Sequence, residues 1–308
     1  MVRMTVLASG SKGNSTIVAS TSTRILVDAG LSCRELMKRM KLAGEDPASL
    51  DAIVITHEHQ DHVQGLAVTA RKLGIPVYIT EPTHRAWVRW MNPRRRVTYA
   101  EWLEQWKARR TQEDAADSPP AMEEAAAVEE AAAEATRDPA TLPAVEYFCS
   151  GEGFRIGDMA VTPFTIPHDA IDPVGFVFES EGIRIGLATD LGYMPSNLHM
   201  HLRGCDILML ESNHDVDMLR DGPYPWSVKQ RVMSRVGHLS NDAAAEFLQH
   251  SYDGHAAYVV LAHLSESNNL PELARISAER ALRDKMSLLA NRLLLAEQSS
   301  PLQPIVVG

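Results

Sequence analysis

Short apolar runs, separated by turns rich in Gly, Ser and Asn, dominate the beginning of the chain. Residues 4–8, 15–19 and 24–28 are such runs, and each has the length and composition of a β-strand. The stretch 9–14 (Ser-Gly-Ser-Lys-Gly-Asn) has the composition of a tight turn. Residues 52–56 (Ala-Ile-Val-Ile-Thr) are apolar without alternation, which is typical of a strand buried on both faces. This pattern predicts several strands close together in sequence.

Helical and extended patterns follow one another along the rest of the chain. Ser32 and Glu35 have the spacing of a capping box at the start of a helix. Helical spacing predicts helices at 33–41, 62–73, 225–235, 240–250 and 271–285. Extended patterns predict strands at 76–79, 159–166, 175–180, 183–189, 206–211 and 257–261. Because the strands come in meanders and do not alternate strictly with helices, we expect an α+β fold, an αββα sandwich of two sheets with helices outside.

Residues 101–143 break this pattern. A Pro-Pro pair is followed by Ala/Glu runs over 123–134, and an Asp-Pro pair comes near the end of the segment. With almost no apolar face, the segment cannot contribute to a packed core. We therefore predict a peripheral acidic insertion in a single domain that spans 1–308. A coiled-coil partner helix is the alternative, but the segment has no heptad of large apolar residues.

The net charge of −10 at first argues against a nucleic-acid partner. Residues 101–140, however, contain 11 acidic and 4 basic side chains, so the rest of the chain carries only −3. That remainder includes five arginines within 85–96. A nearly neutral body with a basic patch can approach phosphate, whereas a uniformly acidic one would repel it. Charge therefore leaves a nucleic-acid partner open.

The cysteines and the apolar runs indicate where the protein works. Cys33, Cys149 and Cys205 are odd in number and lack C-x-x-C spacing, so neither a disulfide framework nor a zinc finger is indicated. A reduced, cytoplasmic environment fits this usage. The first residues have no apolar segment typical of a signal peptide. No apolar run approaches the roughly 18 residues of a membrane helix, so we expect no membrane partner.

The strongest chemical signal is Thr-His-Glu-His-Gln-Asp-His at 56–62, directly after a predicted buried strand. His57, His59, Asp61 and His62 place three imidazoles and a carboxylate within six residues. Such a cluster at the end of a rigid strand is what a metal site requires. Imidazole suits zinc, manganese or iron, and the carboxylate adds charge. A solvated His-rich loop is the alternative, but a run of polar groups directly after an apolar strand favours the metal site.

This His-x-His-x-Asp-His motif, with Asp-Ala-Gly at 28–30 closing an earlier strand, resembles the metallo-β-lactamase superfamily of hydrolases. The resemblance implies an αββα fold with a two-metal site at the edge where the two sheets meet. It also implies three later ligands in the order His, Asp, His, each near a strand end. His168, Asp190 and His263 occupy such positions. The resemblance covers about residues 4–285, apart from the insertion.

By the same resemblance, the chain binds two divalent metal ions, either zinc or manganese, with iron as a further option. Asp190 would bridge the two ions, and Asp28 would orient a ligand. The implied ligands are His57, His59 and His168 for one ion, and Asp61, His62 and His263 for the other. Two ions about 3.5–4 Å apart can share a water, lower its pKa and orient it for attack.

The positions that follow the metal motif narrow the resemblance. Only 73 residues separate Asp190 from His263, which leaves no room for the extra domain of the β-CASP nucleases. Glu211 and His238, in Glu-Ser-Asn-His-Asp and Gly-His-Leu-Ser-Asn, resemble the phosphodiesterase branch that includes tRNase Z. In that branch a Glu pairs with a His that protonates the leaving oxygen. The implied catalytic residues are therefore Asp61, Glu211 and His238, although the residues after Glu211 differ from the tRNase Z pattern.

The chain resembles the YycJ (WalJ) family of bacterial exonucleases more closely. The shared motifs lie at 8–14, 168–170, 211–216, 237–241 and 263–269. This resemblance implies a cytoplasmic two-metal phosphodiesterase that acts on nucleic acid, DNA rather than RNA, as an exonuclease. A small-molecule cyclic phosphodiesterase of phosphoribosyl or nucleotide type and tRNase Z-like RNA processing are alternatives on the same metal core. A non-catalytic binding protein is disfavoured because all seven ligands are present.

Three features have no assigned role at this point. His214 either lines a phosphate pocket or caps the following helix. The arginines at 94–96 either contact a nucleic-acid backbone or form a solvated edge. The tryptophans at 87, 90, 102 and 106 have helical spacing, which favours packing over base stacking. The oligomeric state is left open.

Overall fold

The computed structural model describes residues 1–92, 138–285 and 292–308. The chain divides into two compact units, one of Met1–Ala86 and Leu142–Gly308 and the other of Trp87–Thr141. Most of the predicted insertion at 101–143 lies outside the described residues, as do the arginines at 94–96. The insertion and the single domain over 1–308 therefore stay predictions.

The first sheet of the larger unit has seven strands in the order β14-β1-β2-β3-β4-β5-β6. The pairs β14/β1, β1/β2 and β2/β3 are antiparallel, whereas β3, β4, β5 and β6 run parallel. The strands are Val2–Ala8 (β1), Ser15–Ala19 (β2), Arg24–Val27 (β3), Ala52–Val54 (β4), Val77–Ile79 (β5), Val145–Tyr147 (β6) and Ile305–Val307 (β14). The strand predicted at 52–56 to be buried on both faces is buried throughout.

The second sheet also has seven strands, in the order β13-β12-β11-β10-β9-β8-β7. β7 to β10 form an antiparallel meander, and β10 to β13 run parallel. The strands are Phe154–Ile156 (β7), Met159–Thr165 (β8), Val174–Ser180 (β9), Ile183–Ala188 (β10), Ile207–Glu211 (β11), Tyr258–Ala262 (β12) and Arg292–Leu295 (β13). Both sheets are therefore mixed.

The two sheets of this unit pack face to face around one apolar core. Met4, Val18 and Ile25 of the first sheet share a buried cluster with Phe176 and Phe178 of the second. Alternate residues of a strand point to the same face, so each sheet presents a continuous apolar surface to the other. Burying each of these side chains contributes about 1.5–3 kcal/mol. This core holds the strand ends in fixed positions.

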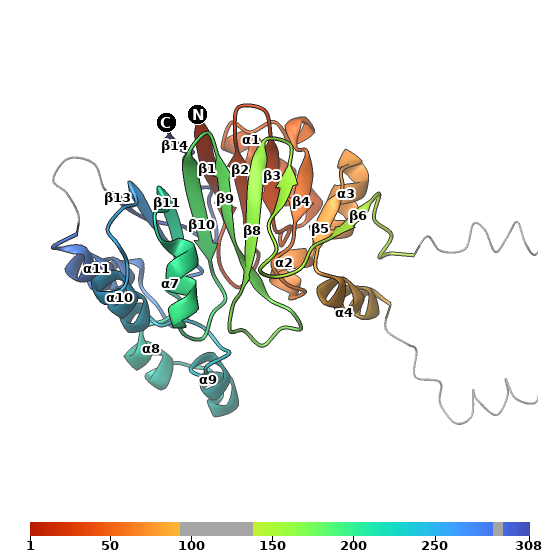
Figure 1. Cartoon of the computed structure of the whole chain (residues 1–308). Helices are drawn as coiled ribbons and strands as arrows, with labels where there is room; N and C mark the ends of the chain where they lie inside the picture. The colour runs from red at the N-terminus through yellow and green to blue at the C-terminus, as the bar shows by residue number, and fades with distance from the viewer. Residues whose placement is uncertain (93–137, 286–291) are drawn as a thin grey trace, which may run out of the picture. The chain divides into compact units, whose positions relative to one another are not determined.

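Helices cover the outer faces of the sheets (Figure 1). On the second sheet, Leu202 of α7, Phe247 of α10 and Leu282 of α11 pack in one cluster with Leu208 of β11. On the first sheet, α1 buries Leu36. The helices are Cys33–Leu42 (α1), Gln60–Val63 (α2), Leu66–Leu73 (α3), Glu81–Met91 (α4), Ser196–Leu202 (α7), Val216–Asp221 (α8), Trp226–Val232 (α9), Asn241–His250 (α10) and Pro271–Leu282 (α11), with a 3-10 turn at Pro47–Ser49. The predicted αββα sandwich is confirmed.

The prediction of one helix over 62–73 is wrong, because the chain bends at Gly65 between α2 and α3. The Gly65 N–H donates to the Ala29 carbonyl oxygen at 2.8 Å. A Cβ at Gly65 would lie 2.0 Å from the Leu31 carbonyl oxygen, so only glycine allows this close approach. The break separates the turn that carries the His motif from the helix that follows it.

Four strands that the apolar pattern does not predict, β6, β7, β13 and β14, are the edge strands of the two sheets. Edge strands are short and paired on one side only, so their sequences carry a weaker apolar signal. The predicted cap of α1 is confirmed: Ser32 Oγ accepts from the Glu35 N–H at 3.3 Å. No helix in the described parts of the chain has the length and apolar character to cross a membrane.

Candidate metal centre

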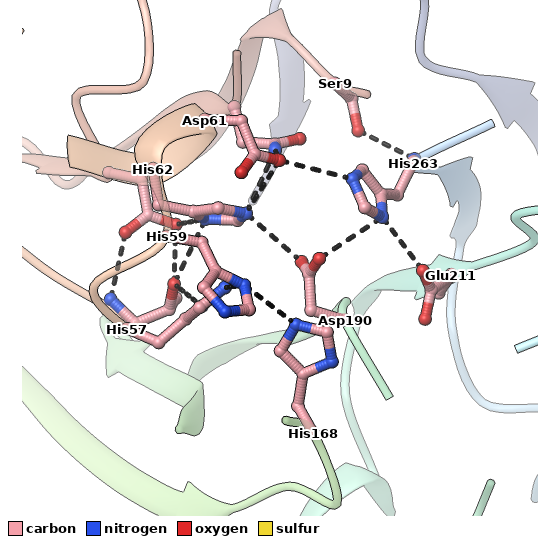
Figure 2. Close-up of polar contacts among 12 residues, drawn as sticks. Ser9, His57, His59, Asp61, His62, His168, Asp190, Glu211 and His263 are labelled. Atoms are coloured by element: carbon pink, nitrogen blue, oxygen red, sulfur yellow. Dashed lines mark hydrogen bonds and ion pairs between the residues drawn. The ribbon is translucent and has the colours of Figure 1, made fainter. Parts of the chain in front are cut away.

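Polar side chains gather where the strands of the larger unit end (Figure 2). β10, β11 and β12 are parallel, and β8 points the same way as β10 because both are antiparallel to β9. The predicted site residues follow these strands and their counterparts in the first sheet: Asp28 after β3, 57–62 after β4, His168 after β8, Asp190 after β10, Glu211 in β11 and His263 after β12. The fold thus brings together residues that are up to 235 positions apart in sequence.

Three of these residues have left-handed backbone conformations. The φ angles are 60° at Asp28, 61° at Asp190 and 57° at His263, and in the described residues Glu181 is the only other non-glycine with positive φ. Such conformations cost about 1–3 kcal/mol each and persist only where surrounding contacts hold them. At His263 the contact is a hydrogen bond from its backbone N–H to Ser9 Oγ at 2.8 Å. Backbone strain of this kind, here at the ends of β3, β10 and β12, is typical of functional sites.

The first group of candidate ligands consists of His57, His59 and His168. The His59 Nδ1 atom lies 3.1 Å from His57 Nε2 and 3.2 Å from His168 Nε2. The His168 Nδ1 atom lies 3.1 Å from the Gly237 carbonyl oxygen, which can only accept. This contact places the proton on Nδ1 and leaves the Nε2 lone pair facing the other two imidazoles. His57 Nδ1 lies 3.0 Å from Thr56 Oγ1, whose hydrogen is donated to Asp28 Oδ2 at 2.9 Å.

The second group consists of Asp61, His62, Asp190 and His263. His62 Nε2 lies 3.4 Å from Asp190 Oδ2 and 3.5 Å from Asp61 Oδ2. His263 approaches the same two carboxylates, with Nδ1 3.3 Å from Asp190 Oδ1 and Nε2 3.7 Å from Asp61 Oδ2. Two imidazoles and two carboxylates therefore face one another around one small volume.

Asp28 and Asn14 contact the imidazole and carboxylate side chains of this second group. Asp28 Oδ2 lies 2.7 Å from His62 Nδ1, and Asp28 Oδ1 accepts from the Thr56 N–H at 2.9 Å. Asn14 Nδ2 donates to Asp61 Oδ2 at 3.1 Å and lies 3.0 Å from His62 Nε2. Asp28 is thus in contact with a candidate ligand, and its role in orienting a metal ligand stays a prediction. No sequence pattern pointed to Asn14 as a site residue, although it belongs to the Gly/Asn turn at 9–14.

Glu211 and His238, the predicted pair, are in contact: Glu211 Oε1 lies 2.8 Å from His238 Nδ1. The same oxygen lies 2.8 Å from His263 Nδ1. The other oxygen, Oε2, accepts from the N–H groups of Leu191 at 2.8 Å and Leu239 at 3.2 Å. One fully buried carboxylate therefore serves two imidazoles, a connection that the sequence pattern did not predict.

The charges at the site shift the pKa values of its members in opposite directions. Burial lowers the pKa of His57 well below its usual value. Burial acts on His62 in the same sense, but Asp190 and the neighbouring carboxylates outweigh it and raise the pKa of His62 well above its usual value. Against their own burial, the carboxyl groups of Asp61 and Asp190 have pKa values well below the usual range because of the imidazoles around them. The His238 imidazole likewise outweighs burial and holds the pKa of Glu211 at about 2.

The residues present fit a pair of divalent cations. Asp190 Oδ2 and His263 Nε2 are buried and, within the described part of the chain, make no hydrogen bond. Imidazole nitrogen and carboxylate oxygen are the ligand types of zinc, manganese and iron sites. Four carboxylates, from Asp28, Asp61, Asp190 and Glu211, also concentrate negative charge that cations would neutralise. Metal binding by these residues stays a prediction.

A cavity of about 150 Å³ opens beside the two groups. Its lining includes His59, Asp61, Asp190, His238 and His263. The other lining residues, which sequence analysis missed, are Ser11, Asn213, Tyr224, Val232, Ser265 and Asn268. Val232 belongs to α9 and the others to loops. Ser11, Asn213, Ser265 and Asn268 fall within the motifs shared with the exonuclease family, but no role was assigned to them because Ser and Asn are not the side chains that typically bind zinc.

Of the two alternatives for His214, capping of the following helix is wrong, and lining of a phosphate pocket stays a prediction. His214 is buried and is not part of the cavity lining, and Asp215, not His214, caps α8 by accepting from the Met218 N–H. Burial lowers the pKa of His214 to about 4. Trp87 is buried, which agrees with packing, whereas Trp90 is exposed. The tryptophans at 102 and 106 lie outside the described residues.

Comparison with known proteins gives the family to which this site belongs. Residues 8–263 match the metallo-β-lactamase superfamily. The chain is 33% identical over 284 residues to exodeoxyribonuclease YycJ of Bacillus anthracis, covering 92% of this chain and 90% of the relative. It is 31% identical over 275 residues to exodeoxyribonuclease WalJ of Streptococcus pneumoniae, covering 89% of this chain and 86% of the relative. The resemblance stated from the sequence is confirmed.

A solved structure shows the same fold at much lower identity. The metallo-β-lactamase fold protein YhfI of Bacillus subtilis superimposes with a TM-score of 0.60 and 16% identity. The match covers 98% of this chain and 100% of that chain. The αββα architecture is therefore shared even where the sequences have diverged.

Proposed function

The chain belongs to the metallo-β-lactamase superfamily of metal-dependent hydrolases, and from this premise we propose that it is a two-metal phosphodiesterase that degrades DNA from an end. The observation that carries the proposal is the pair of His/Asp groups beside the Glu211–His238 contact, in one cavity. Two relatives that cover most of the chain are named exodeoxyribonucleases, which supports DNA as the substrate. We propose the cytoplasm as its location, which agrees with three cysteines outside any disulfide.

His57, His59 and His168 would hold one ion, and Asp61, His62, Asp190 and His263 the other. The family resemblance implies that Asp190 would also contact the first ion. Bound there, zinc, manganese or iron ions would neutralise charge on the phosphate and lower the pKa of a water between them. Asp28 and Asn14 keep His62 and Asp61 in place through the hydrogen bonds described above. Because these contacts are made by the protein itself, the ligands are oriented before a substrate arrives.

The contacts of His238 support a role as the proton donor. Its Nδ1 atom faces Glu211 Oε1 at 2.8 Å, so its Nε2 atom is the nitrogen left to face the cavity. As the oxygen of a deprotonated water would bond to phosphorus and the bond to the leaving oxygen would break, the Nε2 proton would move to that oxygen. The proton lost by the water would go to solvent, from which His238 would be protonated again. Glu211 keeps the imidazole in the orientation that this transfer needs. His238 is 22% exposed, which leaves it open to the substrate side.

The experiment is a digestion of end-labelled DNA by protein loaded with manganese or zinc. Linear single-stranded and duplex DNA should lose nucleotides progressively from an end, whereas covalently closed circular DNA should remain intact. Absence of nucleotide release from all linear substrates would contradict the proposal. Cleavage of the closed circle would show an endonuclease instead.

A second candidate, a cyclic phosphodiesterase acting on small nucleotide or phosphoribosyl substrates, is favoured by the net charge of −10 and by the small cavity of about 150 Å³. RNA processing of the tRNase Z kind is a further alternative on the same metal core. The three enzyme classes can be told apart by the rate at which the protein hydrolyses a chromogenic diester in the presence of competing DNA or RNA. A DNase should be inhibited by DNA at low salt and recover as salt rises, because phosphate contacts release counterions. A small-molecule enzyme should be insensitive, and an RNA-processing enzyme should respond more strongly to RNA.

A further inference from the structure

The turn 9–14, between β1 and β2, contacts candidate metal ligands that follow strands of both sheets. Ser9 Oγ accepts from the backbone N–H of His263, which follows β12, at 2.8 Å (Figure 2). Asn14 Nδ2 donates to Asp61 Oδ2 at 3.1 Å, and the Asn14 N–H donates to the Asp61 carbonyl oxygen at 2.7 Å. Asp61 comes from the segment after β4 of the first sheet. One turn therefore supports ligands on both sides of the candidate metal centre.

The turn 9–14 depends on contacts from outside to keep its shape. Gly10 and Gly13 have φ angles of 147° and 150°, which glycine adopts readily and other residues rarely do. Within the turn, the Gly13 N–H donates to the Gly10 carbonyl oxygen at 3.1 Å, and Asn14 Oδ1 accepts from the Gly10 N–H at 2.8 Å. Glycine loses more conformational freedom on folding than any other residue. Ordering this turn is therefore costly in entropy, and contacts with the rest of the chain must offset that cost.

Gln298, in the segment after β13, makes such contacts with its side-chain amide. The Oε1 atom accepts from the Lys12 N–H at 2.7 Å, and the Nε2 atom donates to the Gly13 carbonyl oxygen at 3.0 Å. A Cβ at Gly10 would lie 2.7 Å from Gln298 Oε1, so the turn and this side chain fit closely together. Both polar atoms of one amide thus pair with the backbone of the turn, across 286 and 285 positions of the sequence.

Gln298 is itself held by elements of both sheets. The buried Arg39 of α1, the helix that follows β3, donates from Nη1 to the Gln298 carbonyl oxygen at 2.7 Å. Two residues before Gln298, the Ala296 N–H donates to the carbonyl oxygen of Leu261, near the end of β12, at 2.8 Å. The backbone that carries the amide is therefore fixed, so the amide can hold the turn at a defined position relative to the strand ends.

We propose that Gln298 is a positioning residue of the candidate metal centre, which acts through the turn 9–14 on Asp61 and His263. With the amide in place, the turn is ordered before metal arrives, and the two ligands are held where the metal needs them. Without the amide, metal binding must also order the turn, so the affinity for metal falls. The inference rests on the metal binding in the proposed function, and it adds a residue outside the segment 8–263 that matches the superfamily.

The test compares metal binding by variants that keep the length of the side chain. Gln298→Met removes both hydrogen bonds to the turn and leaves a side chain of similar size. It should lower metal affinity about 5-fold, the factor that corresponds to the net contribution of one hydrogen bond. Gln303→Met, at an exposed position of the same C-terminal segment, is the matched control and should leave the affinity unchanged. Calorimetric titration of the metal-free protein with zinc or manganese measures the affinity and the number of ions bound.

Two further measurements separate positioning from a merely structural role. In the metal-free protein, Gln298→Met should speed hydrogen exchange at the Lys12 N–H and its neighbours in the turn, and bound metal should slow this exchange again. In a protein that already carries Asn14→Ala, Gln298→Met should lower metal affinity by a smaller factor than in the unaltered protein. The reason is that Asn14→Ala removes the side-chain contact through which the turn acts on Asp61, and residues that act through a shared contact are not additive.

Three outcomes would overturn the inference. Gln298→Met could bind metal as tightly as Gln303→Met, it could lower the free energy of unfolding without changing metal affinity, or its effect could be the same with and without Asn14→Ala. Nucleotide release from end-labelled DNA is measured in parallel, so that failure of the two proposals can be told apart. Metal affinity that depends on Gln298 without any hydrolysis would contradict the proposed function alone, and hydrolysis with metal affinity indifferent to Gln298 would contradict this inference alone.

Discussion

A single oxygen atom, Glu211 Oε1, links the candidate proton donor to the candidate metal ligands. It lies 2.8 Å from Nδ1 of His238 and 2.8 Å from Nδ1 of His263. His238 also belongs to a third group of possible metal ligands, with Asp190, Glu211 and His263. At the scale of single residues, the open question is therefore whether His238 donates a proton or binds metal.

Replacing His238 by alanine separates these roles. If His238 donates a proton, His238→Ala should lower turnover roughly 10²–10⁴-fold and leave the metal content unchanged. His59→Ala should lose metal together with activity, because a nitrogen ligand is removed. Metal per chain and hydrolysis rate are measured on the same preparations, with His250→Ala on α10 as control. Loss of metal from His238→Ala, or an unchanged rate, would show that His238 is not the proton donor.

Glu211→Gln should weaken metal binding as well as catalysis. Glu211 Oε2 accepts from two backbone N–H groups, so an amide in its place either points its NH₂ group at these donors or turns it toward the imidazoles. Either orientation leaves a buried donor unpaired, at a cost of about 1–3 kcal/mol. We expect metal affinity to fall about 10- to 100-fold, the usual effect of losing a group that orients a ligand. Titration with metal measures this, with the exposed Glu179→Gln as control, and unchanged affinity would mean that Glu211 acts through His238 alone.

At the scale of elements, the break between α2 and α3 positions the His motif. α2 is one short turn that carries Asp61 and His62, and α3 begins only after Gly65. The His62 carbonyl oxygen accepts from the Ala29 N–H at 2.8 Å, which ties the turn to the loop after β3. A continuous helix would carry these side chains away from the strand ends.

Gly65→Ala should therefore disturb both stability and the site. The new Cβ would lie 2.0 Å from a backbone oxygen, Leu31 O, that cannot move aside as a side chain could. We expect a loss of about 1–3 kcal/mol in unfolding free energy, typical of overpacking, and weaker metal binding. Chemical denaturation and metal titration measure the two effects. Gly153→Ala, where the nearest atom is 3.6 Å away, should leave both unchanged, and equal effects of the two variants would contradict this explanation.

At the scale of the whole molecule, hydrogen bonds to one carboxylate join the two sheets of the larger unit. Asp158, between β7 and β8 of the second sheet, accepts from Thr23 Oγ1 and from Ser20 Oγ at 2.8 Å, both in the turn between β2 and β3. It also accepts from Ser180 Oγ at 3.0 Å. These hydrogen bonds, above all the one from Thr23, hold the pKa of Asp158 well below its usual value.

The low pKa predicts a pH-dependent contribution to stability. A carboxyl group with a depressed folded-state pKa stabilises the protein above its unfolded pKa of about 3.9, and this contribution is lost as the pH falls toward the folded-state value. Asp158→Asn should cost about 0.5–1.5 kcal/mol at neutral pH, since the site is partly open to solvent. The difference from the unaltered protein should shrink below about pH 4. The free energies of unfolding of the unaltered protein and Asp158→Asn are measured by chemical denaturation at several pH values, with the exposed Asp284→Asn as the control. A stability difference that does not change with pH would contradict the prediction.

The sequence by itself determined the parts of this protein that depend on local order. The buried strand at 52–56 and the His motif directly after it are contiguous, so the residue types alone indicate the burial of the strand and the chemistry of the motif. The central strands and the helices α10 and α11 also follow from apolar periodicity, because one face of each packs on a core. The helix α7, which packs on the same sheet, was not predicted. The later residues His168, Asp190 and His263 were found by family resemblance, which supplies the order that local patterns lack.

Only the tertiary structure decided what depends on contacts between distant segments. Asn14 reaches Asp61 across 47 positions, and Glu211 is shared by His238 and His263. Tyr224 and Val232 line the cavity for the same reason. Periodicity records whether a side chain is buried, but not which partner it meets, since that partner is set by the packing of strands far apart in the chain. The edge strands escaped prediction because, with one neighbour and little core contact, their sequences are under weaker apolar constraint.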